Sequence, residues 1–129
     1  MPGPSALPPL LVVDAANVVG SVPDGWWRDR RGATERLRDS LTGLAEEGLP
    51  GLLPGPVEIV LVVEGRARGV EPVAGVRVVA APGSGDDAIV GLAAEAGGRR
   101  CLVVTADRAL RERVARHGAE CAGPRAVRP

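Results

Sequence analysis

The stretch Leu10-Leu11-Val12-Val13-Asp14 decides the fold class of this chain. Four consecutive apolar residues that stop at an acid are typical of a short parallel strand covered on both of its faces. Further apolar runs predict three more such strands, at residues 57–63, 76–81 and 101–105. Apolar residues at helical spacing, or a capping pattern followed by apolar residues, predict helices at residues 31–47, 86–96 and 108–117.

Strands that alternate with helices predict an α/β fold with right-handed crossovers. We therefore expect a single-domain parallel sheet of four to five strands, with helices on both faces, and residues 119–122 as the optional edge strand. The Gly- and Pro-containing segments are expected to be connections, at residues 15–27, 48–56 and 65–75. The expected domain spans residues 9–124, between a flexible lead-in at 1–8 and a tail at 125–129.

The composition limits the class of protein further. The chain has 129 residues, which predicts one domain, and its 2% of aromatic residues predict an aliphatic core. No apolar run approaches the roughly 20 residues of a membrane helix, and no signal peptide opens the chain, so we expect a cytoplasmic protein without a membrane segment. Cys101 and Cys121 lack metal-ligand spacing and are expected to be small core residues.

All 16 basic residues are arginines, and the chain contains no lysine. This absence excludes P-loop nucleotide hydrolases and Schiff-base enzymes, which need an active-site lysine. It also argues against haloacid-dehalogenase phosphatases and response-regulator receivers, which place Asp at strand ends but depend on a lysine. The single His makes a zinc site built from His and Cys improbable.

Acidic residues follow every predicted central strand. They are Asp14, Glu64, the pair Asp86-Asp87, and Asp107. The carboxyl ends of parallel strands meet at one edge of a sheet, where ligands bind, so these acids are expected to gather there. Clustered carboxylates repel one another unless a cation offsets the charge, and carboxylate oxygens suit Mg²⁺ or Mn²⁺.

Some of these acids have a purely structural alternative. The stretch Ser84-Gly85-Asp86-Asp87 fits a capping box, in which Asp87 would stabilise the start of a helix. Asp107 fits the N-cap of the last helix. Asp14 is followed by a predicted loop and has no helix to cap, which favours a functional role.

Three stretches resemble the motifs of the NYN and PIN-like ribonuclease superfamily. Asp14-Ala15-Ala16-Asn17 after an apolar strand resembles the opening motif. Gly85-Asp86-Asp87-Ala88-Ile89 resembles the middle motif, in which acids open a helix. Val103-Val104-Thr105-Ala106-Asp107-Arg108 resembles the late motif, a strand followed by Ser/Thr-x-Asp. The motifs occur in the family order, and the resemblance covers residues 10–122.

The resemblance implies a metal-dependent phosphodiester hydrolase that acts on RNA. The implied metal ligands are Asp14, Asp86, Asp87 and Asp107, with Glu64 where relatives carry an acid after the second strand. Our hypothesis places Asp14 at the centre, completes the direct ligands with Asp86 and Asp107, and lets Asp87 and Glu64 bind through water. Asn17 would position a ligand or water, so the expected catalytic set is Asp14, Asp86, Asp107 and Asn17.

A substrate strand needs phosphate contacts and a surface on which bases can stack. The expected substrate-binding residues are Trp27, Arg28, Arg31, Arg66, Arg68 and Arg108. The alternative is that one of the tryptophans belongs to the core and that the arginines are solvated.

Two other functions stay open at this point. One is a nucleoside triphosphate pyrophosphohydrolase with the same metal chemistry, although the E-x-x-E motifs of its all-α members do not occur here. The other is a catalytically idle RNA-binding or protein-interaction module with the same fold. A homodimer and an inhibitory protein partner are further possibilities that the residues do not decide.

Overall fold

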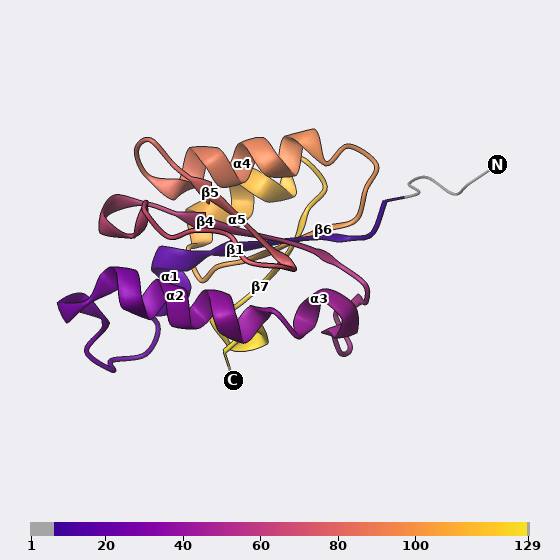
Figure 1. Ribbon diagram of the computed structural model, residues 1–129. Coiled ribbons are helices and arrows are strands. Elements are labelled where there is room, and N and C mark those ends of the chain that lie inside the picture. Colours follow the sequence, from indigo (N-terminus) through magenta and orange to yellow (C-terminus); the bar gives the residue numbers. More distant parts are fainter. Residues whose placement is uncertain (1–6, 129) are drawn as a thin grey trace.

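The computed structural model describes residues 7–128, and its centre is a five-stranded sheet (Figure 1). All neighbouring strands of this sheet are parallel. In chain order the strands are β1 (Leu10–Asp14), β4 (Glu58–Val63), β5 (Val76–Ala80), β6 (Cys101–Val104) and β7 (Glu120–Ala122). The predicted α/β class, the parallel sheet and the edge strand at the end of the chain are thereby confirmed.

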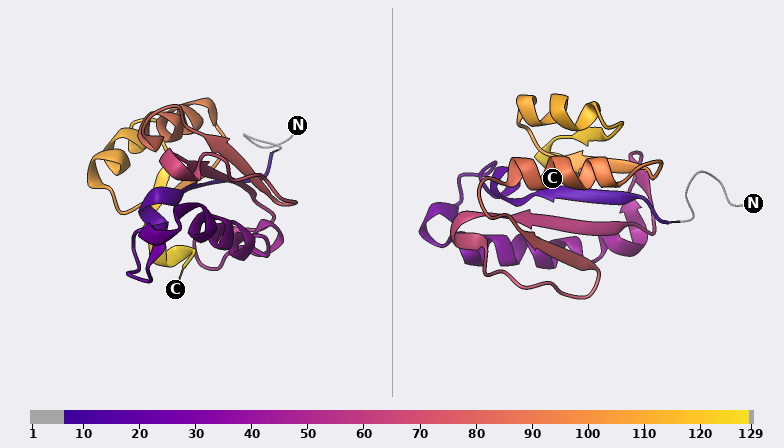
Figure 2. Two further views of the ribbon diagram at one scale, coloured as in Figure 1. Left: turned by 60° about the vertical axis from the view of Figure 1, so that its left-hand side comes forward. Right: turned by 90° about the horizontal axis from the view of Figure 1, so that it is seen from above.

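Helices cover both faces of the sheet, as Figures 1 and 2 show. One face carries α1 (Ala15–Val19), α2 (Arg30–Leu41) and α3 (Leu44–Glu47), and the other carries α4 (Gly85–Glu95) and α5 (Arg108–Ala115). Leu11 and Val13 of β1 point to the first group of helices, whereas Leu10 and Val12 point to the second. Because both faces are covered, the strand is apolar at every position before Asp14.

The strand order places a ligand crevice at a definite point. The sheet runs β5-β4-β1-β6-β7, so the chain builds outward from β1 to β5 and then restarts on the other side of β1 with β6. The order therefore reverses between β1 and β6. In open α/β sheets, ligands bind outside the carboxyl ends of the two strands that flank this reversal. Here those ends are Asp14 and Val104.

The prediction of a loop over residues 15–27 was wrong. Helix α1 follows β1 directly, and a 3₁₀ turn covers Trp26–Arg28. The residues Ala15, Val18 and Val19 are buried at helical spacing, but five residues are too few for this periodicity to stand out in the sequence. Asp14 therefore does precede a helix, although its side chain forms no capping hydrogen bond.

The connections contain more structure than the sequence indicated. The helix expected over residues 31–47 is divided into α2 and α3. The connection after it contains a short antiparallel pair, β2 (Gly48–Leu49) with β3 (Leu53–Pro54). Gly48 has a φ of 71°, and a Cβ there would lie 2.3 Å from the Leu53 carbonyl oxygen, so the turn from α3 into β2 requires glycine.

The ends of the expected domain can be described only in part. Residues 1–6 of the expected lead-in, and Pro129 of the expected tail, lie outside the described residues. A 3₁₀ turn covers Pro124–Ala126, the side chain of Val127 is buried, and Arg128 forms an ion pair with Asp24.

The core is aliphatic, as the composition predicted, and both cysteines are free thiols. Burial raises the pKa of Cys101 to about 11, which fits a small core residue rather than a reactive thiol. Within residues 7–128, no helix combines the length and the apolar character needed to cross a membrane.

Candidate functional site

The site is built around Asp14, the last residue of β1. Its side chain is buried, with 6% of the residue exposed. The Thr105 hydroxyl donates a hydrogen bond of 2.8 Å to Asp14 Oδ2, and the Asp107 backbone N–H donates one of 3.1 Å to Thr105 Oγ1. A chain of hydrogen bonds thus joins β1 to the segment after β6, at the point where the strand order reverses.

The electrostatic environment of Asp14 favours its neutral form. Burial raises the pKa of this carboxyl above its usual range, and repulsion from Asp86 and Glu64 acts in the same direction. The Thr105 hydroxyl and the Asn17 backbone N–H favour the ionised form and oppose the rise only in part. A bound cation would remove this penalty, because it interacts favourably with the ionised carboxylate.

Glu64 connects the end of β4 to the start of α4. The Gly85 backbone N–H donates a hydrogen bond of 3.0 Å to Glu64 Oε2. This carboxylate therefore stabilises the N-terminus of α4, where Ser84 forms no side-chain capping bond. The capping-box interpretation of this segment was accordingly wrong. The same hydrogen bond holds the start of α4, including Asp86, at the edge of the sheet where Asp14 lies.

Asn17 lies one helical turn after Asp14 and ties α1 to the segment after β6. Its Oδ1 accepts a hydrogen bond of 2.8 Å from the Ala106 backbone N–H. Within residues 7–128, its Nδ2 group donates to no other residue. Asn17 therefore fixes the local geometry and keeps a donor available at the same edge.

The other two predicted acids have structural partners. Asp107 accepts a hydrogen bond of 3.1 Å from the Leu110 backbone N–H through Oδ1, and so caps α5 as the sequence alternative predicted. Asp87 is exposed and accepts a hydrogen bond of 2.8 Å from Arg113 of α5. Asp86 and Glu64 thus lie near enough to Asp14 to raise its pKa, whereas Asp87 points towards α5.

The donor set can be compared with the needs of a metal ion. In the described part of the chain, no three His, Cys, Asp or Glu side chains are grouped closely enough to hold an ion by themselves. Mg²⁺ is usually held by only one or two carboxylates, with water and substrate phosphate as the remaining ligands. Asp14 and Asp86 are near enough to repel each other, and carboxylate oxygens are ligands of a hard cation such as Mg²⁺ rather than of Zn²⁺.

A pocket of about 340 Å³ lies beside these acids. It is lined by residues of α1, of the 3₁₀ turn before α2, of α2 itself and of the turn after β4. They are Ala15, Ala16, Val19, Trp26, Arg30, Thr34, Glu64, Gly65 and Ala67. Trp26, Arg30 and Thr34 were not predicted as site residues, and no signal in the sequence separates Trp26 from Trp27. Thr105 was also missed, although it stands in the late motif.

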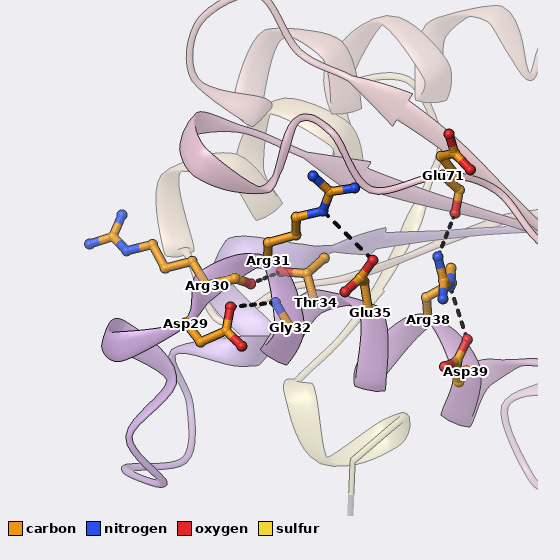
Figure 3. A network of polar contacts seen from close by, with 9 residues as sticks. All are labelled: Asp29, Arg30, Arg31, Gly32, Thr34, Glu35, Arg38, Asp39 and Glu71. Carbon is orange, nitrogen blue, oxygen red and sulfur yellow. Dashed lines mark hydrogen bonds and ion pairs between the residues drawn. The ribbon is translucent and has the colours of Figure 1, made fainter.

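The predicted substrate arginines come from several segments of the chain. Arg28 and Arg31 come from the start of α2 and the turn before it, and Arg31 approaches Gly69 in the segment after β4. Figure 3 shows Arg31 reaching towards that segment and Arg30 extending in another direction. Arg66 and Arg68 are exposed in that same segment. Arg108 is exposed at the start of α5.

The tryptophans differ in their surroundings. Trp26 is half-buried and packs against the hydrophobic core, as the alternative that one tryptophan belongs to the core predicted. Trp27 is 51% exposed and does not line the pocket. Arg30 lies 5.3 Å from the centre of the Trp26 ring, and Arg28 lies 6.0 Å from that of Trp27.

The fold is shared with solved structures, whereas sequence comparisons give no match. No family model matches this chain, and no curated protein matches it in sequence. The crystal structure of Rae1 (YacP) from Bacillus subtilis superposes with a TM-score of 0.72 at 17% identity, over 92% of this chain and 70% of that chain. Its W164L mutant gives a TM-score of 0.69 at 18% identity over the same shares. At this level of identity, the likeness establishes a common fold.

Proposed function

We propose that this protein is a divalent-metal-dependent nuclease that hydrolyses phosphodiester bonds in RNA. The observation that carries the proposal is the buried Asp14 carboxylate, which lies where the strand order reverses and is repelled by Asp86 and Glu64. The resemblance of three sequence motifs to the NYN and PIN-like ribonucleases supports it, as does the fold shared with Rae1.

Asp14 and Asp86 would hold Mg²⁺ or Mn²⁺ directly. Glu64 would act through water, because one of its oxygens already accepts from Gly85. Asp107 would contribute through the oxygen that is not bonded to Leu110. When bound, such an ion lowers the pKa of a water molecule and neutralises the phosphate that the water attacks.

The side chains around the acids have roles of their own. The Thr105 hydroxyl orients the Asp14 carboxylate through the 2.8 Å hydrogen bond. The Nδ2 group of Asn17 is placed to donate to a phosphate oxygen at the same edge. The exposed arginines Arg66 and Arg68 would neutralise the phosphates on either side of the bond that is cut.

An extended substrate is favoured over a free nucleotide by the spread of the arginines. They lie on the start of α2 and on the segment after β4, beyond the pocket itself. Contacts to several phosphates require a strand, and they predict an affinity that falls as the salt concentration rises.

The test is incubation of purified protein with labelled RNA, labelled DNA and nucleoside triphosphates, with Mn²⁺ and with EDTA. We expect cleavage of RNA that depends on Mn²⁺ and falls to background in Asp14→Asn. The matched control is Glu58→Gln, because Glu58 begins β4 at the opposite end of the sheet and should leave cleavage unchanged. Equal rates for Asp14→Asn and the unmodified protein would contradict the proposal, and release of pyrophosphate from triphosphates alone would replace it.

A further inference from the structure

The pocket beside the acids shares residues with the proposed active site. Ala15 and Ala16 directly follow Asp14, and Glu64 belongs both to the pocket wall and to the carboxylates that act on Asp14. A ligand in the pocket would therefore lie next to the bond that the acids act upon. This proximity connects whatever fills the pocket with the chemistry at the sheet edge.

The chemistry of the lining suits a flat ring with a polar edge. The small side chains of Ala15, Ala16 and Ala67 leave space, and Trp26 supplies an aromatic surface. The polar groups are the Glu64 carboxylate, the Arg30 guanidinium and the Thr34 hydroxyl. Thr34 donates its proton to the Arg30 carbonyl, which leaves the hydroxyl oxygen as an acceptor. A nucleobase combines a ring that stacks with an edge of donors and acceptors.

Trp26 is held in place before any ligand arrives. It packs against the core, meets the edge of Trp27 with ring centres 5.9 Å apart and planes at 85°, and lies 5.3 Å from the Arg30 guanidinium. A ring fixed in this way loses little conformational freedom when a ligand binds, which favours affinity. Trp27 shares the ring contact with Trp26 and lies near Arg28, but it is half exposed rather than packed against the core.

We propose that this pocket receives one unpaired nucleobase of the substrate strand, which is stacked on Trp26 and adjacent to the scissile phosphate. The proposal rests on the nuclease function proposed above. A volume of about 340 Å³ accommodates one base, and a base whose edge faces the pocket wall cannot pair with another base at the same time, so the substrate is single-stranded at that nucleotide. The polar edge formed by Glu64, Arg30 and Thr34 makes the cleavage selective for certain bases.

Binding can be measured without cleavage, because the chain has only two tryptophans. In Trp27→Phe, Trp26 is the single tryptophan and reports on the pocket by its fluorescence. We expect the four nucleoside 5′-monophosphates, titrated in EDTA, to quench this signal saturably and to different extents. Ribose 5-phosphate, which lacks the base, should leave it unchanged. Equal quenching by ribose 5-phosphate, or none by any nucleotide, would overturn the base pocket.

A second measurement compares the two tryptophans directly. We expect Trp26→Leu to weaken the binding of single-stranded RNA about 5- to 150-fold, the range of one lost base stack, and Trp27→Leu to weaken it less. Trp26→Phe, which keeps a ring, should recover most of the loss, and thermal unfolding should show that each variant is folded. A larger loss in Trp27→Leu than in Trp26→Leu contradicts the assignment. Because all binding is measured in EDTA, failure of the base pocket is distinguishable from failure of metal-dependent cleavage.

Discussion

Replacing Asp14 by Asn should make the metal-free protein more stable. Burial and the charges of Asp86 and Glu64 penalise the ionised carboxylate, and Asn carries no charge. Asn keeps an oxygen that accepts from the Thr105 hydroxyl, so the hydrogen bond at this position can persist. At pH 7 in EDTA we expect a gain of roughly 0.5–2 kcal/mol in the free energy of unfolding, the usual range for a single stabilising substitution.

The size of this effect changes with pH in a direction that the structure determines. The pKa of Asp14 is raised above its ordinary value of 3.8, so the folded protein retains this proton at pH values where the unfolded chain has lost it. Stability therefore falls as the pH rises from about 3.8 through the raised pKa. The variant lacks this fall, so its advantage should be absent near pH 3 and should grow as the pH rises through the raised pKa.

Metal should reverse the order of the two proteins. A ligand that binds only the folded state at 100 times its dissociation constant adds about 2.7 kcal/mol. With roughly 2.1 cal/mol/K of unfolding entropy per residue, this corresponds to a rise in Tm of about 10 °C for a chain of 129 residues. Asp14→Asn should gain much less.

Thermal unfolding followed by circular dichroism, with and without millimolar Mn²⁺ at pH 3 and pH 7, measures all three effects. An Asp14→Asn protein that is less stable than the unmodified protein in EDTA would refute the reasoning from burial and repulsion. Equal metal-induced shifts in the two proteins would show that the ion binds elsewhere.

Three further substitutions separate structural from functional roles. Asp107→Asn keeps a good capping residue, so we expect its Tm to change little while its Mn²⁺-dependent cleavage falls. Asp107→Ala should also lose about 1 kcal/mol of stability. Full cleavage activity in the Asn variant would show that Asp107 serves only as a helix cap. Thr105→Val removes the buried hydrogen-bond donor to Asp14, so we expect the free energy of unfolding at pH 7 to fall by about 1.5–3 kcal/mol and the pKa of Asp14 to rise further. An unchanged midpoint in urea unfolding would exclude a stabilising role for this hydrogen bond. The hydrogen bond from Arg99 lowers the pKa of Glu58, so Glu58→Gln should lose at most about 1 kcal/mol of stability at pH 7 and none once the pH falls below that lowered pKa. A loss of stability in urea unfolding that does not depend on pH would assign the effect to packing instead.

The sheet was predictable because its strands are covered on both faces. Each of the central strands is a nearly continuous aliphatic run, and the structure confirms that alternate residues of β1 face different helical layers. The position of Asp14 and Glu64 at strand ends followed from the same pattern, since parallel strands end at a common edge.

Apart from the cap that Asp107 forms on α5, the partners of the acids could not be predicted, because they depend on how the helices pack. The sequence offered Ser84 as the cap of α4, but Glu64, 21 residues before Gly85, takes that role. We expected Asp86 and Asp87 to act together because they are adjacent in the sequence. Consecutive side chains on a helix point about 100° apart, however, so Asp87 faces Arg113 of α5. Helix α1 escaped prediction because its five residues form little more than one turn.

Glu64 shows how the proposed chemistry and the proposed recognition depend on one another. Its carboxylate stabilises the start of α4, acts on Asp14 by repulsion, and forms part of the wall of the pocket. A base that donates a hydrogen bond to Glu64 would withdraw negative charge from the neighbourhood of Asp14, and would thereby favour the ionised form that holds a cation. Occupation of the pocket and binding of the metal should therefore be mutually favourable, since linkage between two sites is reciprocal. The proposed nuclease would therefore bind its metal most tightly when the correct base is already in place.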